Sequence, residues 1–112
     1  MELTETAVLD REQLRDITLD DEDLMREILT ALIDDTSRQI RLMESAIEEK
    51  DSKKTMRLAH YSKGACANVG AKAAATLLKH IENQASQGAF PECGSSLAAL
   101  AHELDRLREV TV

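Results

Sequence analysis

The chain has 112 residues, with one tyrosine, one phenylalanine and no tryptophan, and its net charge is −7. This length fits one domain that can bury a core without disulfides or metals, and the scarcity of aromatic residues disfavours β-sheets. The negative charge argues against nucleic acid as the main partner, and no apolar run is long enough to cross a membrane. We therefore expect a single all-α domain over residues 1–112.

Cysteine usage and the N-terminus indicate the compartment. Cys66 and Cys93 lack the spacing of metal ligands, and no apolar secretory segment opens the chain. We expect a cytoplasmic protein in a reducing environment. The acidic leader over residues 1–9 is expected to be poorly ordered, and together with Met1 it favours a free-standing protein.

The first two predicted helices are a short one and a long one. Asp10 is placed to cap the short helix, in which Leu14 and Ile17 are the expected apolar contacts. The long helix starts at Thr18 or Asp20 and continues to about residue 50. Its apolar residues recur at helical spacing. They are Leu24, Ile28, Leu32, Ile40, Met43 and Ile47.

Two further helices follow with clear start and stop signals. Asp51 or Ser52 caps the third helix, and Gly70 ends it because glycine tolerates the left-handed conformation that closes a helix. The fourth helix is predicted over residues 71–87, and Gly88 ends it.

The last helix is expected after a Phe-Pro turn at residues 90–91, with Gly-Ser-Ser at residues 94–96 as its cap. Its expected inward residues are Leu97, Leu100, Ala101, Leu104 and Leu107. Four long amphipathic helices with short connections predict an antiparallel up-and-down four-helix bundle, with the short N-terminal helix across one end.

The charges are unevenly distributed along the chain. Residues 52–81 carry six basic side chains and no acidic one, whereas residues 1–51 carry sixteen acidic and six basic side chains. The basic stretch can attract an acidic protein surface or a phosphoryl group. An alternative is that it forms salt bridges with the acidic helix before it.

One stripe of the third helix lies inside this basic stretch. His60, Lys63, Gly64 and Ala67 are spaced by three, four and seven residues, so they share one helix face. The complementary face is mostly apolar or small, as a buried face requires. We therefore expect the imidazole of His60 to point towards solvent, where another molecule can approach it.

The residues around this histidine carry a recognisable motif. Residues 59–64 read Ala-His-Tyr-Ser-Lys-Gly and residues 67–71 read Ala-Asn-Val-Gly-Ala. The sequence closely resembles the signature of histidine-containing phosphotransfer (HPt) domains, Ala-His-x-Leu-Lys-Gly followed by Asn-Leu-Gly-Ala. It departs from that signature at Tyr61, Ser62 and Cys66, which we interpret as packing positions. The resemblance covers the whole chain and implies a four-helix bundle with the motif on its second helix.

The resemblance also implies a function. His60 would accept a phosphoryl group from the aspartyl phosphate of a receiver domain and pass it to the aspartate of another. The implied partners are response-regulator receiver domains, a hybrid histidine kinase, or both. The implied protein is a monomeric phosphoryl carrier, without independent turnover, and it needs no cofactor because the receiver supplies Mg²⁺.

Neighbouring residues have physically plausible tasks in such a transfer. Lys63 can offset negative charge on the phosphoryl oxygens. Glu82, where family members commonly carry Glu or Gln, is our candidate for accepting a hydrogen bond from the second imidazole nitrogen. The residues assigned to the partner surface are Lys53, Arg57, Gly64 and Ala67.

Two other interpretations compete with phosphotransfer. The chain could be a non-catalytic adaptor that binds receiver or kinase domains while His60 stays idle. The histidines, including His80 and His102, could instead bind a metal or haem, although no His or Cys pair has suitable spacing. The sequence contains no nucleotide-binding motif, so we do not expect phosphorylation from ATP.

Overall fold

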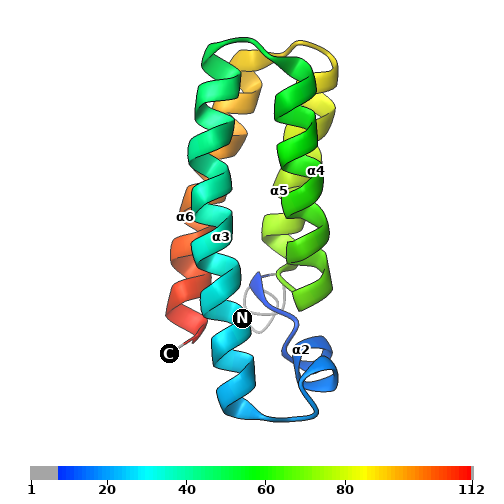
Figure 1. The fold of residues 1–112 in the computed structure, drawn as a ribbon, viewed down its shortest axis with the longest axis vertical. Coiled ribbons are helices and arrows are strands. Elements are labelled where there is room, and N and C mark those ends of the chain that lie inside the picture. Colours follow the sequence, from blue (N-terminus) through cyan, green and yellow to red (C-terminus); the bar gives the residue numbers. More distant parts are fainter. Residues whose placement is uncertain (1–7, 112) are drawn as a thin grey trace.

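The computed structural model describes residues 8–111, and over that range the chain forms helices and no strand. In chain order the helices are α2 (Arg11–Ile17), α3 (Glu22–Glu48), α4 (Ser52–Val69), α5 (Lys72–Ser86) and α6 (Phe90–Thr111). Figure 1 shows the four long helices side by side, with α2 at one end. No helix in the described part of the chain is long and apolar enough to span a membrane.

The core lies between the four long helices. Helix α3 packs against α4 and α6, and α5 packs against the same two helices, whereas α2 contacts α4. Aliphatic side chains and small residues fill the interior. The largest fully buried hydrophobic side chains are Leu9, Leu14, Met43, Leu78, Ile81, Leu100, Leu104 and Leu107.

The connection between α2 and α3 differs from the predicted one. Leu19 and Asp20 have positive φ angles of 54° and 65°, so the chain turns there and α3 begins after Asp21, which caps it. Ile17 is 52% exposed and makes no core contact of the kind we expected.

The buried face of α3 is also wider than the predicted stripe. Leu24 is exposed, whereas Leu29, Ile33, Thr36 and Ala46 are buried beside two of the predicted residues. Helix α3 contacts both α4 and α6, so two adjoining stripes of the helix face neighbours.

The start of α6 was also predicted wrongly. The helix begins at Phe90, so residues 94–96 lie inside it and do not cap it. Pro91 occupies the first turn, where the missing N–H of proline costs nothing because that donor has no intrahelical partner. Of the predicted inward residues, Ala101 is exposed and the four leucines are buried.

The N-terminal leader is partly inside the described range. Residues 1–7 lie outside it. Val8 and Leu9 are buried in the core, so the leader packs against the helices at these two residues. Their apolar side chains gain stability by leaving water.

Asp10, which caps α2, and Gln13 within α2 close the C-terminal end of α4. Gly70 ends α4 in the left-handed conformation, with φ of 94°. The backbone N–H of Asp10 donates to the Gly70 carbonyl at 2.8 Å, and Gln13 Nε2 donates to the carbonyls of Ala67 at 2.7 Å and Asn68 at 3.1 Å. The last carbonyls of a helix lack intrahelical partners, so these contacts satisfy groups that would otherwise need water.

Substituting Gly70 with alanine is expected to destabilise the fold by about 2 kcal/mol or more, because a left-handed alanine costs about 1–2 kcal/mol. In addition, the new Cβ would lie 2.8 Å from the backbone oxygen of Asp10. Urea unfolding followed by circular dichroism measures the loss. Gly88→Ala is the matched control, because Gly88 has φ of 70° but no atom within 4 Å of the added Cβ. Equal losses in the two variants would contradict the contribution of the Asp10 contact.

Replacing Gln13 with the similarly shaped methionine removes both hydrogen bonds to the end of α4. We expect the free energy of unfolding to fall by about 1 kcal/mol, the usual net value of such bonds. Urea unfolding again measures it, and Gln39→Met, at a half-buried glutamine of α3, serves as the control. Unchanged stability of Gln13→Met would show that water replaces the side chain without loss.

Candidate functional site

His60 lies in the middle of α4 with its side chain 69% exposed, which confirms that the imidazole points towards solvent. A carboxylate on the next helix, α5, binds one nitrogen of the imidazole ring. His60 Nδ1 lies 3.0 Å from Glu82 Oε2 on α5. The structure therefore brings together two residues that the sequence separates by 22 positions.

Lys63 joins the same carboxylate. Its Nζ donates to Glu82 Oε1 at 2.8 Å, so each oxygen of Glu82 serves one partner. Partial burial alone would raise the pKa of Glu82, but the hydrogen bonds from Lys63 and His60 outweigh it and lower this pKa. Glu82 is therefore ionised at neutral pH, and its carboxylate binds both the ammonium group of Lys63 and the imidazole of His60.

This arrangement selects the imidazole tautomer. An ionised carboxylate only accepts hydrogen bonds, so in the neutral ring Nδ1 carries the proton that Glu82 accepts. Nε2 then holds the free lone pair. Since no other described residue forms a hydrogen bond or ion pair with the exposed ring, Nε2 is available to act as a nucleophile or a base.

The residues assigned to the partner surface lie on α4 on either side of His60 along the helix. Gly64 is exposed, and a Cβ built there would meet no atom within 4 Å, so the space beside His60 is open. Ala67 is exposed one turn further on. Lys53 and Arg57 are exposed nearer the start of α4. Neither forms a hydrogen bond or ion pair with His60, so they add positive charge to this face of α4 without binding the ring.

Two of the three departures from the motif are packing positions and one is not. Ser62 and Cys66 are buried, and burial raises the pKa of the Cys66 thiol to about 11. Tyr61 is instead 56% exposed, so our interpretation of it as a packing residue is wrong. The inward positions of α4, which include Ala59, Ser62 and Cys66, repeat at intervals of three and four. Tyr61 falls outside that repeat, and this was the signal available in the sequence.

Tyr61 makes a contact that the sequence did not predict. Its hydroxyl donates to Asp35 Oδ2 on α3 at 3.1 Å, and Asp35 Oδ1 accepts from Arg38 at 3.2 Å. The hydrogen bond to Asp35 raises the pKa of Tyr61 above its usual value, because ionisation would place two negative charges together. This hydrogen bond links the side chain of Tyr61 on α4 to α3, at the residue that follows His60 in the sequence.

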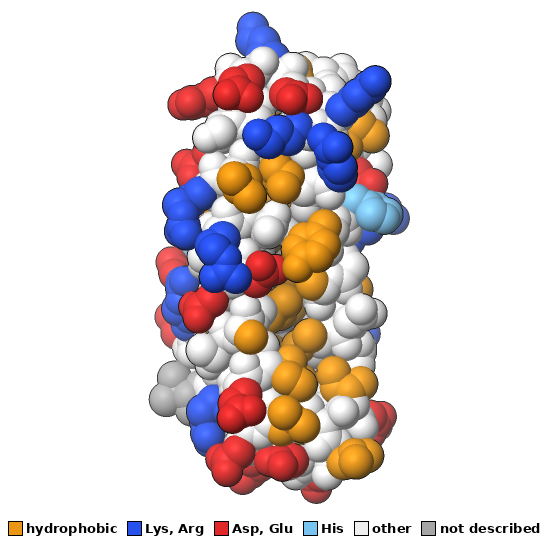
Figure 2. Space-filling view, viewed as in Figure 1, with side chains coloured by type: hydrophobic (Ala, Val, Ile, Leu, Met, Phe, Trp, Pro, Cys, Tyr) orange, Lys and Arg blue, Asp and Glu red, His pale blue; other side chains and the backbone are white. Residues whose placement is uncertain are grey.

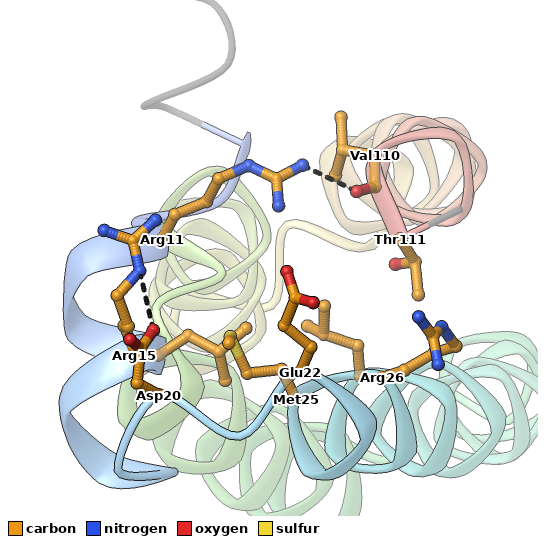
Figure 3. A pocket seen from close by; sticks show the side chains of 10 residues that line it. Arg11, Arg15, Asp20, Glu22, Met25, Arg26, Val110 and Thr111 are labelled. Carbon is orange, nitrogen blue, oxygen red and sulfur yellow. Dashed lines mark hydrogen bonds and ion pairs between the residues drawn. The ribbon is translucent and has the colours of Figure 1, made fainter.

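A cavity of about 380 Å³ lies between α2, α3 and the end of α6. Figure 3 shows Glu22 pointing into it, among the arginines of α2 and Arg26. Arg15 pairs with Asp20 at 3.4 Å, and Arg11 donates to the Val110 carbonyl at 2.7 Å. The charges of the cavity are therefore mixed and largely paired, and its lining includes none of the predicted site residues.

The histidines do not converge with other ligands. Within residues 8–111, no group of three or more His, Cys, Asp or Glu side chains could hold a metal ion. His80 and His102 are exposed on α5 and α6, and no hydrogen bond or ion pair holds either side chain. The described part of the chain therefore gives no support to the metal or haem interpretation.

Comparison with known proteins places this geometry in a family. The family model described as the Hpt domain matches residues 27–110. Among solved structures, histidine-containing phosphotransfer protein B from Pseudomonas aeruginosa superposes with a TM-score of 0.84 at 23% sequence identity, covering 93% of this chain and 90% of that one. At that identity the likeness shows the fold alone. A search of curated protein sequences found no significant match. Because the family model spans most of the sequence and includes the exposed histidine with its lysine and glutamate, the chain belongs to the Hpt domain family of two-component phosphotransfer modules.

Proposed function

We propose that this chain is a phosphoryl carrier in which His60 Nε2 accepts a phosphoryl group from a receiver aspartyl phosphate and passes it to another receiver aspartate. Hpt family members act with receiver domains and kinases in phosphorelays. The observation that carries the proposal is the bridging carboxylate of Glu82, which binds His60 Nδ1 and Lys63 Nζ at 3.0 and 2.8 Å.

The transfer step needs little from this chain beyond orientation. The Nε2 lone pair attacks phosphorus, a P–N bond forms, and the P–O bond breaks as the electron pair leaves with the receiver carboxylate. Nδ1 keeps its proton, so the ring becomes a phosphorylated imidazolium whose positive charge faces Glu82. In the onward step the ring leaves phosphorus as neutral imidazole. Glu82 thus supports transfer in both directions.

Lys63 supplies the charge that the phosphoryl group needs. It lies one turn from His60, and Glu82 holds its ammonium group near the ring. A cation placed there stabilises negative charge on the phosphoryl oxygens, which is where catalysis of such a transfer mostly lies. Gly64 and Ala67 leave room for the partner, and Lys53 and Arg57 steer an acidic surface towards the histidine.

The proposal also covers the arrangement of the helices, the location and oligomeric state of the protein, and the source of Mg²⁺. We propose that α3 to α6 form an antiparallel up-and-down four-helix bundle, which the short connections support. The carrier acts as a cytoplasmic monomer without an ATP site or turnover of its own. The receiver partner brings the Mg²⁺ that its own acidic pocket binds.

Replacing His60 with glutamine is expected to abolish phosphorylation, because glutamine offers no nucleophilic ring nitrogen. The test is incubation with a receiver carrying radiolabelled phosphate, followed by transfer of label that is acid-labile and base-stable in the wild type. Undiminished label on His60→Gln would refute His60 as the acceptor. Receiver binding without transfer in either direction would favour the adaptor interpretation.

Lys63→Ala should slow transfer by about tenfold, because the cation that stabilises the phosphoryl oxygens is lost. The unfolding midpoint should change little, because a single ion pair at a half-buried lysine, here with Glu82, contributes about 1 kcal/mol or less. Rapid-quench measurement of label transfer gives the rate. Lys79→Ala is the matched control, since Lys79 is an exposed lysine in the same basic stretch. If the two variants transfer at equal rates, Lys63 has no role in the mechanism.

A further inference from the structure

Few large hydrophobic side chains are exposed in the described residues, and they fall into two groups. Ile17, Leu19 and Leu24 lie around the turn from α2 to α3, whereas Leu42 and Tyr61 lie on α3 and α4. Figure 2 shows hydrophobic side chains along the face formed by α3 and α4, with Lys and Arg side chains bordering them in its upper half. The second group is therefore part of a face that also carries positive charge.

Tyr61, in this second group, has apolar neighbours on both α3 and α4. Leu58 precedes it by three residues, so the two share a face of α4, and Leu58 is half-buried. Leu42 lies two turns beyond Asp35 on the same face of α3, and Asp35 binds the Tyr61 hydroxyl. We call Tyr61, Leu58 and Leu42 the Tyr61 patch.

A hydrogen bond ties the Tyr61 side chain to α3 although the residue is exposed. Its hydroxyl donates to Asp35, and Asp35 also binds Arg38, so the negative charge of Asp35 is matched on the surface. A ring fixed in this way loses little conformational freedom when a partner covers it. Tyrosine is enriched among the residues that dominate interface energies, and those residues are surrounded by others that exclude water.

Because Tyr61 is next to His60 in the sequence, a partner that docks at His60 also covers the Tyr61 ring. A partner that brings an aspartyl phosphate to His60 Nε2 covers about 800 Å² of this chain, the usual area for a specific complex. Such an area extends well beyond the residue next to His60. The exposed side chains of Arg38 and Arg57 border the Tyr61 patch, so the complementary surface is apolar with an acidic rim.

We propose that Tyr61, held by Asp35, is an affinity-determining docking residue for the receiver that exchanges phosphoryl groups with His60. The proposal rests on the proposed function. Tyr61 contacts an apolar patch of that receiver, and the Arg38–Asp35 pair keeps the ring in place before the partner arrives. The residue acts in binding and takes no part in the chemical step.

The first experiment separates binding from chemistry by measuring transfer rates over a range of phosphorylated receiver concentrations. Tyr61→Ala should raise the half-saturating receiver concentration by about tenfold, the loss expected at an interface aromatic residue. The saturating rate should stay within about twofold of the wild type. Tyr61→Phe and Asp35→Ala both remove the hydrogen bond and keep a ring, so their effects should be smaller and equal to each other. Leu19→Ala is the matched control, because Leu19 is 90% exposed and lies in the other group.

A second experiment reads docking without transfer. Tyr61 is the only tyrosine of the chain, so biosynthetic fluorotyrosine gives a single fluorine NMR signal. In the His60→Gln variant this signal should shift or broaden on adding the unphosphorylated receiver. An ultraviolet titration of unlabelled protein should also show that Asp35→Ala lowers the pKa of Tyr61 towards 10.0.

Several outcomes would overturn the inference. An unchanged half-saturating concentration in Tyr61→Ala would exclude a docking role, and a reduced saturating rate alone would place Tyr61 in the chemistry. A fluorine signal unaffected by saturating receiver would also exclude it. If the wild type accepts no label at all, the proposed function fails, whereas a fluorine shift under the same conditions would still support docking at Tyr61.

Discussion

The close approach of α4 and α5 is the constraint on which the site depends. Small side chains at the interior positions of both helices make that approach possible, because they let two helix backbones come near each other. These residues are almost completely buried: Ala59 and Cys66 on α4, and Ala74 and Ala85 on α5. The carboxylate of Glu82 can then reach across to α4. A larger side chain at one of these positions would push the helices apart and separate Glu82 from its two partners.

The same packing reconciles two opposing needs of a reactive histidine. The ring must be exposed so that a protein partner can reach Nε2, yet it must be oriented, and exposed side chains are ordinarily mobile. Glu82 is more buried than His60, with 22% of its side chain exposed against 69%. The orienting group is thus anchored in the structure while the reacting group projects from it. Lys63 benefits from the same anchor, since its ammonium group is held by the second oxygen.

The parts of this structure that were predictable are those fixed by neighbours in the sequence. Asp10 and Gly70 were correctly placed as helix ends, and Asp51 is one of the two residues expected to cap α4, because capping depends on the residue and the few that follow it. Helical spacing likewise put His60 and Lys63 on one face. The start of α6 was missed because a proline was interpreted as a break, although the first turn of a helix accommodates it. Tyr61 was misplaced because its exposure depends on where α3 lies, and its partner Asp35 is 26 residues away. The contact of Glu82 with both His60 and Lys63 depends on the rotation of α5 against α4, which no local pattern determines.

The contact between the α2 segment and the end of α4 bears on where this domain begins. The family match starts at residue 27, within α3, whereas the groups that close the helix carrying the histidine come from Asp10 and Gln13. Lys72, at the start of α5, also pairs with Asp10 at 3.2 Å. The unit that folds is therefore longer than the range that the family model matches. A chimera or minimal module that starts at residue 27 would retain every residue of the motif. It would lack the Asp10 and Gln13 groups that bind the last carbonyls of α4, near Gly70.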